Sequence, residues 1–402
     1  MDLLLSRTIG LLVVAIFVAI VSRRLRLPYT VGLVITGVSL ALAPPATAID
    51  LTHEFIFDVI LPPLLFEAAL SIHWSELRRD ALPVLTLATL GVAISAAVVA
   101  SGMVLLVGWP VPSALIFGVL IAATDPVAVI AMFKDTGIKG RLRLLVESES
   151  LLNDGVAAVL FVIALGWAQA AGEGTLTARQ IAGALTLTSG GGVLIGLACG
   201  GLAIALAGRT SDHLVETALT TVAAYGSFLL AEHFRVSGVL ASVSAGLLMG
   251  NLGILGQRDF LLLGGREFVI AFWNFAAFIA NSFVFLLIGV TVGHLPLTGL
   301  GPLALAVSVA LVLLGRALTV YPLCLLFRWS RWAVPMRGQH VLWWGGLRGA
   351  LALALALALP PSLPGRHEIV AAAFGVVAFS VVVQGLTMPP LLRLLGLFPR
   401  RS

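Results

Sequence analysis

A short run of acidic and polar side chains leads directly into a long apolar stretch of the chain. Residues 147–154 read Glu-Ser-Glu-Ser-Leu-Leu-Asn-Asp, and the residues after Asp154 are mostly apolar. A charged side chain near the centre of a lipid bilayer costs several kcal/mol, and ionisable groups found there usually line an ion path or pair with one another. Asp154, the last acid of the run, is therefore a candidate for a group that binds a proton or a cation.

Helical geometry divides this run between two faces. Ser150 and Asp154 are four residues apart and lie on one face, while Glu149 and Asn153 lie on another. Glu149 and Asp154 are about 140° apart around the helix axis, so one carboxylate can serve a site while the other has a different role. At about 1.5 Å per residue, Asp154 lies roughly 16 Å from the start of the apolar helix, close to the middle of a bilayer.

Two other segments carry oxygen ligands to a similar depth. Glu67 lies in the inner half of an apolar stretch, and residues 124–126, Thr-Asp-Pro, interrupt another. A hard monovalent cation prefers oxygen ligands, which carboxylates, hydroxyls and free main-chain carbonyls supply. We therefore expect a cation site with four ligands, which are Asp154, Ser150, Glu67 and a carbonyl near Thr124. Two simpler interpretations stay open: Glu67 is a paired or snorkelling carboxylate, and Ser150 bonds back to its own helix.

Arg316 is predicted to lie inside another apolar helix, at about the depth of Glu149. A buried arginine needs a charged partner, and a fixed Glu149–Arg316 bridge would join the two halves of the chain. We expect this pair to be structural.

The composition is that of a polytopic all-α membrane protein. Of 402 residues, 59% are hydrophobic and 11% charged, and the mean hydropathy is +1.08. No water-soluble domain of this size tolerates that balance, and the alternating pattern of an outer-membrane barrel is missing. The net charge of +5 would suit a nucleic-acid partner, but the basic residues follow membrane topology. We expect membrane lipid as a partner and no nucleic acid.

Apolar stretches long enough to cross a bilayer recur along the whole chain. We predict about thirteen transmembrane helices, near residues 4–22, 28–45, 51–72, 80–107, 111–132, 143–170, 179–208, 212–233, 236–253, 266–294, 299–327, 337–360 and 367–396. The first stretch lacks the features of a cleaved signal peptide, so it is expected to remain as a helix. Because the sequence stops soon after the last helix, we expect one membrane domain over residues 1–402 and no soluble regulatory domain.

The basic residues outside the apolar cores gather at alternate helix ends. Only Arg7, Arg179, Arg235 and Arg366 fall at the opposite ends. The positive-inside rule then predicts a multi-pass protein of the cell (inner) membrane with its N-terminus outside and its C-terminus in the cytoplasm.

Two matching interruptions indicate an internal duplication. Proline lacks an N–H group and clashes with the preceding turn, so residues 124–126 break the fifth span. Residues 345–349, Gly-Gly-Leu-Arg-Gly, have low helix propensity and break the twelfth. Such a pair marks the site of transporters with inverted repeats. The predicted parts are a first six-helix repeat at about 1–172, a linker helix at about 179–208 and a second repeat at about 212–396.

Helix breaks leave backbone groups that protein or bound ions must satisfy in a medium without water. Asp125 is suited to neutralise the positive N-terminal ends of two crossing half-helices, and Arg348 the negative C-terminal ends. Kinks that serve packing alone would not require a buried charge at each break. We therefore predict two crossed broken helices, with Asp125 and Arg348 supporting the site.

Four segments, in this order, resemble the monovalent cation:proton antiporters, and among them the NhaP-type sodium/proton antiporters, the branch that includes the animal sodium/hydrogen exchangers. The match spans nearly the whole chain. The segments are Leu61-Pro62-Pro63-Leu64-Leu65-Phe66-Glu67, Thr124-Asp125-Pro126-Val127-Ala128, Glu149-Ser150-Leu151-Leu152-Asn153-Asp154-Gly155 and Gly345-Gly346-Leu347-Arg348-Gly349-Ala350.

The resemblance implies a thirteen-helix protomer with a core of crossed broken helices, a separate dimerisation domain, and a homodimer that works by elevator-like alternating access. It implies that Asp154 is the shared proton and cation carrier, and the further Na⁺ ligands would be Ser150, Glu67 and the Thr124 carbonyl. Asn153 and Asp125 would support the site, and Glu149–Arg316 would be an interhelical bridge. An Asn-Asp pair, where the electrogenic branch has Asp-Asp, implies electroneutral one-for-one exchange. Animal and plant members have long regulatory tails, which the sequence ending at Ser402 does not match.

Competition at one site is sufficient for exchange. Burial favours the protonated form of the Asp154 carboxyl and a bound cation favours the ionised form, so proton and sodium exclude each other. Glu67 nearby couples the titration. If the empty, charged site cannot cross the low-dielectric barrier but both loaded forms can, exchange is obligatory. We predict a sodium/proton antiporter that serves pH homeostasis, with no enzymatic activity and no cofactor.

Three alternatives have less support. A potassium/proton antiporter of the same fold is close, because ligand chemistry hardly separates the two ions. A cation channel generally needs an oligomeric pore with filter-like carbonyl rings, whereas paired broken helices favour alternating access. An intramembrane hydrolase is suggested only by residues 189–192, Ser-Gly-Gly-Gly. Those glycines suit close helix packing, and the sequence offers no matching nucleophile and base.

Overall fold

The structure is a computed structural model that describes residues 2–25, 27–42, 52–170, 177–210, 212–254, 266–294 and 300–397. Within these ranges the chain forms helices and no strand. Parts of the predicted features lie outside the described residues. These parts are the end of span 28–45, the first residue of spans 51–72 and 299–327, residues 1, 26, 43–51 and 171–172 of the first repeat, residues 255–265 and 295–299 of the second, and the last residues of the domain 1–402.

Seven helical segments of the described chain are long and apolar enough to cross a membrane. Each lies at a predicted span. They comprise α4 (Trp74–Gly102) continued by the π-helical η2 (Met103–Val107), α7 (Arg141–Gln169), α8 (Ala178–Ala207), α9 (His213–His233), α11 (Arg266–His294), α12 (Pro302–Leu326), and the continuous run of α15 (Arg366–Phe379), η4 (Ser380–Gln384) and α16 (Gly385–Leu394).

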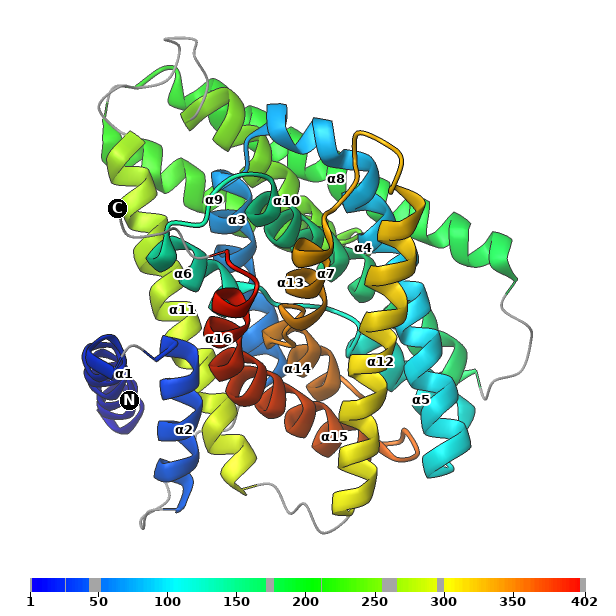
Figure 1. The fold of residues 1–402 in the computed structure, drawn as a ribbon. Coiled ribbons are helices and arrows are strands. Elements are labelled where there is room, and N and C mark those ends of the chain that lie inside the picture. The colour runs from blue at the N-terminus through cyan, green and yellow to red at the C-terminus, as the bar shows by residue number, and fades with distance from the viewer. Residues whose placement is uncertain are drawn as a thin grey trace.

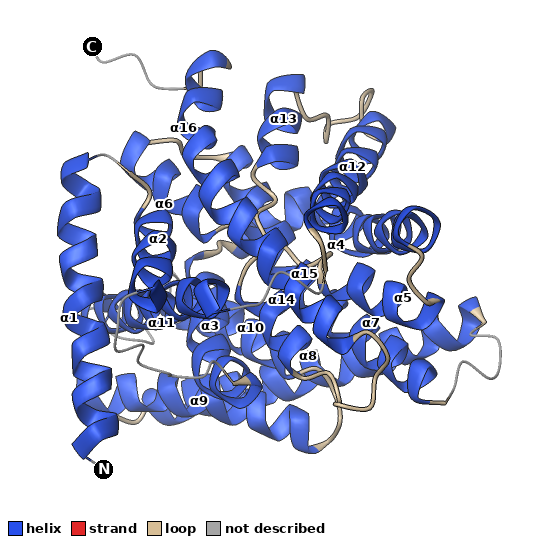
Figure 2. Ribbon diagram, turned by 90° about the horizontal axis from the view of Figure 1, so that it is seen from below, coloured by secondary structure: helices blue, strands red, loops and turns tan. Residues whose placement is uncertain are grey.

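The other predicted spans correspond to one continuous 24-residue helix near the N-terminus and to shorter or interrupted helices. They are α1 (Asp2–Leu25), α2 (Tyr29–Leu42), η1 (Phe55–Ile60) with α3 (Leu61–Ser71), α5 (Val111–Leu120) with α6 (Val127–Thr136), α10 (Gly238–Leu248) with η3 (Met249–Ile254), and α13 (Met336–Trp344) with α14 (Ala350–Leu357). Helix α1 is drawn end-on in Figure 1 and lengthwise in Figure 2, so it crosses α2 steeply.

The predicted start of the fourth span at residue 80 coincides with a break inside α4. Asp80 has φ −109° and ψ 15°, which is not helical. Its carboxylate lies 2.8 Å from the guanidinium of Arg141 at the start of α7. Arg141 also donates to the carbonyls of Trp332 (2.8 Å) and Ala333 (2.7 Å). One arginine therefore joins the beginnings of α4 and α7 to the segment that precedes α13.

The helices pack as two groups (Figure 1). The broken-helix group comprises α4, α5, α6, α7 and α12 to α16, with α4 packed against α12, α5 and α7. The scaffold group comprises α1, α2, α3, α9, α10 and α11, and the long helix α8 packs mainly against its members α9 and α10. A separate apolar cluster around Phe66 and Trp273 joins α3, α9, α10 and the first part of α11.

Equivalent helices of the two predicted repeats make equivalent contacts. In the predicted duplication, the second span (α2) corresponds to the ninth (α10), and the third span (α3) corresponds to the tenth (α11). The pair α2–α11 is then the counterpart of the pair α10–α3, and both pairs pack extensively. Gly37 and Gly289 let α2 and α11 approach closely, because a Cβ atom on either would collide with the backbone of the other helix. Each group thus contains three of the spans assigned to each predicted repeat.

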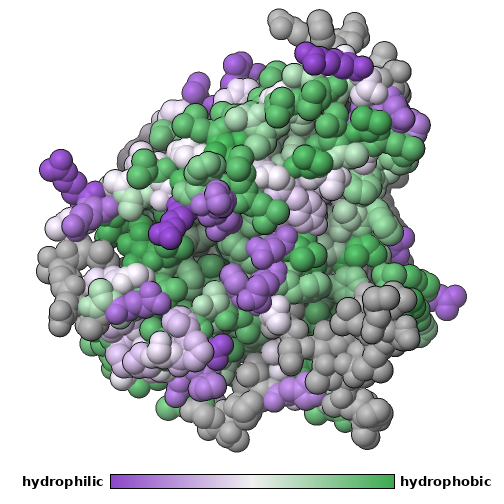
Figure 3. All heavy atoms as spheres, turned by 180° about the vertical axis from the view of Figure 1, so that it is seen from behind, coloured by the Kyte–Doolittle hydropathy of each residue, from purple (hydrophilic) through white to green (hydrophobic). Residues whose placement is uncertain are grey.

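The outer surface carries large apolar side chains. Leu105 is 81% exposed, Leu303 78% and Leu187 76%, and broad apolar areas cover the face seen in Figure 3. A water-soluble protein rarely exposes apolar surface on this scale, whereas a lipid-facing surface requires it.

Candidate cation site

Two interrupted helices cross at the centre of the broken-helix group. The first break separates α5 from α6 and the second separates α13 from α14, at the two places predicted. The breaks are joined by one backbone hydrogen bond, in which the N–H of Asp125 donates to the carbonyl of Leu347 (2.7 Å).

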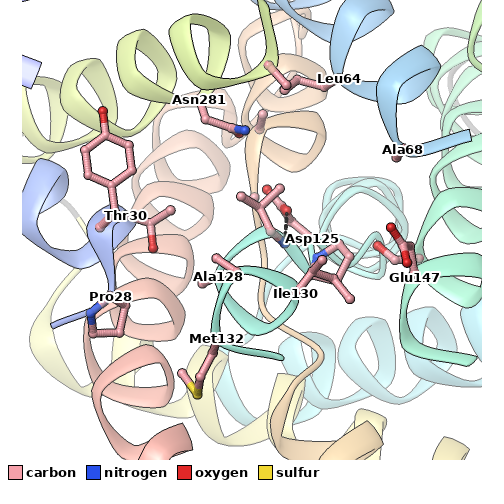
Figure 4. A pocket seen from close by; sticks show the side chains of 18 of the residues that line it. Pro28, Thr30, Leu64, Ala68, Asp125, Ala128, Ile130, Met132, Glu147 and Asn281 are labelled. Atoms are coloured by element: carbon pink, nitrogen blue, oxygen red, sulfur yellow. Dashed lines mark hydrogen bonds between the residues drawn. The ribbon is translucent and has the colours of Figure 1, made fainter. Parts of the chain in front are cut away.

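Asp125 lies at the N-terminal ends of the two half-helices that follow the breaks. Its Oδ1 accepts from the backbone N–H of Val127, the first residue of α6 (3.0 Å; Figure 4), and its carboxylate also interacts with the N–H of Ala350, the first residue of α14. A Cβ atom on Gly349 would collide with the Asp125 carboxylate. The absence of a side chain at position 349 is therefore what allows one acid to face both positive helix ends.

Arg348 is only 1% exposed and reaches the C-terminal end of α5. Its Nη1 donates to the carbonyls of Ala122 (2.7 Å) and Ala123 (3.0 Å). The end of α13 has a different partner, since Nε2 of Gln384 donates to the Trp344 carbonyl (2.9 Å). The structure thus differs from the expectation that Arg348 serves both C-terminal ends, because its side chain extends towards α5 and a neutral amide from η4 satisfies α13.

Asn153 fixes the first break to α7. Its Oδ1 accepts from the N–H of Thr124 (3.2 Å), and its Nδ2 donates to Thr124 Oγ1 (2.6 Å) and to Oε1 of Glu149 (3.0 Å). On the neighbouring face, the hydroxyl of Ser150 donates to the Thr124 carbonyl. Two residues of α7 therefore hold Thr124 through both its backbone and its side chain.

A cavity of about 1110 Å³ is lined by all four predicted ligands, Asp154, Ser150, Glu67 and Thr124. Asp125 lines it as well, from the crossing point. Asp154 and Glu67 are partly exposed, whereas Ser150 and Thr124 are 2% and 3% exposed. Asp154 and Ser150 lie on the cavity face of α7, while Glu149 and Asn153 do not line the cavity, as the helical spacing predicts.

The cavity reaches one end of the helix bundle, which we call the basic end. Exposed side chains of Arg23, Lys134 and Arg393 line its mouth. Away from this end, Gly155 of α7 packs directly against Leu240 near the start of α10, where a Cβ atom on Gly155 would collide with the leucine side chain. Solvent at the basic end therefore has a path to Asp154.

The predicted donor set has the chemistry of a site for a hard cation. It consists of the Asp154 and Glu67 carboxylates, the Ser150 hydroxyl and the Thr124 carbonyl, all of them oxygen ligands. Among the described residues, no three His, Cys, Asp or Glu side chains are placed to hold one metal ion together.

Glu149 and Arg316 form a buried ion pair. Nη1 and Nη2 of Arg316 donate to Oε1 and Oε2 of Glu149, both at 2.8 Å, and the two side chains are 7% and 2% exposed. The Arg316 guanidinium also donates to the carbonyl of Leu342 in α13. A Cβ atom on Gly346 would collide with this arginine. The pair joins α7 to α12 and lies away from the cavity.

Several polar residues near the site were not among those predicted from the sequence. Gln384 was hidden in an apolar span, with no spacing that points to the α13 break. Asn281 lines the cavity from the scaffold group, on the side away from Glu147 (Figure 4). Glu147 was detectable, since it is seven residues from Asp154 and therefore on nearly the same helix face.

The sequence profile described as "Sodium/hydrogen exchanger, transmembrane" matches residues 11–394. The chain belongs to this family. Among curated members of the sodium/hydrogen exchanger family, it is 40% identical over 382 residues to the Na⁺/H⁺ antiporter ApNhaP of Aphanothece halophytica, covering 94% of this chain and 71% of the relative. It is 34% identical over 398 residues to the Na⁺/H⁺ antiporter NhaP of Pseudomonas aeruginosa, covering 92% of each chain.

The fold is that of sodium/hydrogen exchangers of known structure. The sodium proton antiporter MjNhaP1 from Methanocaldococcus jannaschii, at pH 8, matches with a TM-score of 0.79 over 98% of this chain and 100% of that one, at 21% sequence identity. The predicted all-α transporter fold is confirmed by this match.

Proposed function

We propose that this membrane protein exchanges Na⁺ for H⁺ by alternating access, with Asp154 as the group that binds either ion. Membership of the sodium/hydrogen exchanger family supports the exchange itself, since the similar curated members are Na⁺/H⁺ antiporters. The observation that carries the role of Asp154 is its place in the cavity, where it is partly exposed, lines the wall together with Ser150 and Thr124, and is reached from the basic end.

The chemistry follows from competition for one carboxylate. A protonated Asp154 is neutral and offers a poor ligand to Na⁺, while the ionised form attracts it. Ser150 and the Thr124 carbonyl contribute further oxygen ligands, and Glu67 contributes the second carboxylate. Asn153 cannot titrate and is occupied by Thr124 and Glu149, so it adds no second transported charge, which supports electroneutral one-for-one exchange.

The movement would be that of the broken-helix group against the scaffold group. The crossing point, Asp154 and the Glu149–Arg316 pair all belong to the broken-helix group, so the ion and most of its ligands would travel together. The scaffold group would supply the homodimer interface. In this proposal the basic end faces the cytoplasm, in line with the positive-inside rule, and the cavity belongs to the inward-facing state.

The test is proton flux driven by added Na⁺ in proteoliposomes. Asp154→Asn should abolish the flux, and Asp58→Asn, which removes an exposed acid that does not line the cavity, should leave it unchanged. Exchange at the wild-type rate by Asp154→Asn would refute the assignment. Parallel assays with K⁺ and Li⁺ decide the ion, and maximal flux with K⁺ would favour the potassium/proton alternative.

The pH dependence provides a second check. Protons and Na⁺ compete for the same carboxylate, so the Na⁺ concentration for half-maximal flux should rise as pH falls through the titration range of the site. The limiting slope for displacement of one proton is about tenfold per pH unit. A half-saturating Na⁺ concentration that is independent of pH would exclude shared binding.

A further inference from the structure

Glu147 lies on the cavity face of α7, between Asp154 and the basic end. The two residues are seven apart, which places them about 20° from each other around the axis and roughly 10 Å apart along it. Ser150 and Leu151, which lie between them, line the cavity too. Glu147 is the acid of α7 that a cation moving from the basic end towards Asp154 reaches first.

The charge of Glu147 is weakly compensated. Nε of Arg143 donates to its Oε2 at 3.4 Å, and the Arg143 side chain is 26% exposed. A single long contact to a partly solvated arginine one helical turn away contributes little to stability. The other contact is neutral, since the single proton of the Ser71 hydroxyl is shared between Oε1 of Glu147 (3.1 Å) and the Ala68 carbonyl (2.9 Å). Lone pairs of the carboxylate therefore remain available to a ligand.

Glu147 lies near several charged side chains of the cavity. Lys134, Arg23 and Arg393 line the mouth of the cavity, and their positive charges oppose the approach of a cation. Glu67, deeper in the cavity, interacts electrostatically with Lys134, Glu147 and Arg143. A carboxylate inside the mouth attracts a cation against these positive charges.

We propose that Glu147 is a staging ligand, which binds the partly hydrated cation between the solvent at the basic end and Asp154. The proposal rests on the proposed function in one respect, namely that the cavity is the ion path. Glu147 makes no contact with the bound ion at Asp154 and sets the local cation concentration instead. Its contact with Ser71 crosses from the broken-helix group to the scaffold group.

The test compares half-saturating Na⁺ concentrations in proteoliposomes. Glu147→Gln should raise the value about fivefold, the factor given by one Coulomb interaction at contact distance in water, and leave the maximal rate within about twofold. Glu147→Asp should retain the wild-type value. Arg143→Gln should lower it, because the carboxylate loses its compensating charge. The matched control is Glu76→Gln, which removes an exposed acid from the same end of the molecule, outside the cavity.

Ionic strength separates this role from a structural one. Added choline chloride screens the cavity field over about 8 Å at physiological strength, so it should raise half-saturating Na⁺ for the wild type and have little effect on Glu147→Gln. Equal salt dependence in both proteins, or a wild-type value for Glu147→Gln, would overturn the proposal. If Glu147→Gln fails to fold, an unchanged or raised value for Arg143→Gln overturns it instead. Asp154→Asn tests the carrier independently, because its loss of flux does not depend on Glu147.

Discussion

On α7, Glu149 faces Arg316 and the helices of the broken-helix group, whereas Glu147, two residues earlier, faces the cavity. Glu149 accepts two bonds at 2.8 Å from one guanidinium, while Glu147 has a single 3.4 Å contact with Arg143 and a bond from a hydroxyl. The face of α7 that carries Glu149, which we call the fixed face, holds helices together. The cavity face, which carries Glu147, also carries Asp154. In a membrane protein, a buried carboxylate that is permanently paired with a charged side chain has a structural role. A carboxylate without a permanent charged partner can instead bind a transported ion.

The largest difference between the two faces is expected in stability. Glu149→Gln leaves the Arg316 charge buried and unpaired, which should lower the free energy of unfolding by about 3–5 kcal/mol. Glu147→Gln, the matched change on the other face, should alter it by no more than about 0.5 kcal/mol. Thermal unfolding of the purified proteins in detergent measures both. Similar losses from the two variants would contradict the distinction between the faces.

A smaller loss is expected when the fixed face loses its hold on the first helix break. Asn153→Ala removes the partners of the Thr124 N–H and hydroxyl, and a buried polar group left without a partner costs about 1–3 kcal/mol. The half-saturating Na⁺ concentration should also rise, since the Thr124 carbonyl is less well positioned. Gln169→Ala is the control, because it removes an exposed amide of the same helix that does not line the cavity. An unchanged Na⁺ response in Asn153→Ala would show that Thr124 needs no anchoring.

Beyond the cavity, Gly155 tests the close packing of α7 on the scaffold group. Gly155→Val should cost about 1–3 kcal/mol of stability through overpacking, because the new side chain collides with Leu240. Adding Leu240→Ala to the Gly155→Val protein should restore part of the lost stability and, with it, any Na⁺-driven proton flux that Gly155→Val reduces. The double-mutant cycle measures the coupling. Additive losses would mean that the two residues do not share one contact.

The smallest effect is expected at the bond that joins the cavity face to the scaffold group. Ser71→Ala removes the hydroxyl that donates to Glu147, which should cost less than about 1 kcal/mol since the carboxylate keeps access to water. Half-saturating Na⁺ should change by less than about twofold. Proteoliposome flux and thermal unfolding together check this result, and a loss as large as that of Glu147→Gln would assign the effect to the serine.

Most of the architecture could be predicted from the sequence because the bilayer limits what the chain can do. Span lengths, both helix breaks and the face assignments of residues 149–154 follow from hydropathy, proline and glycine chemistry and the helical period. The Glu149–Arg316 pair followed from the need of a buried arginine for a partner. The partner of the α13 break could not be predicted, because Gln384 lies far along the chain and only tertiary packing brings it to Trp344.

The size and direction of the cavity also could not be predicted from the sequence. They depend on how the helices of the two groups pack at the basic end, which hydropathy and helical period do not specify. Asn281 belongs to a helix whose apolar pattern gives no reason to select it, and its position becomes meaningful only once the cavity is seen (Figure 4).

The backbone bond from Asp125 to Leu347 has a consequence for how such a protein can diversify. It fixes the register between two loops that are more than two hundred positions apart in the chain. An insertion or deletion in either loop would misalign the other, so the lengths of residues 121–126 and 345–349 must change together or not at all. Diversity in ion preference is then expected to arise by substitution around the crossing, while the loop lengths stay constant.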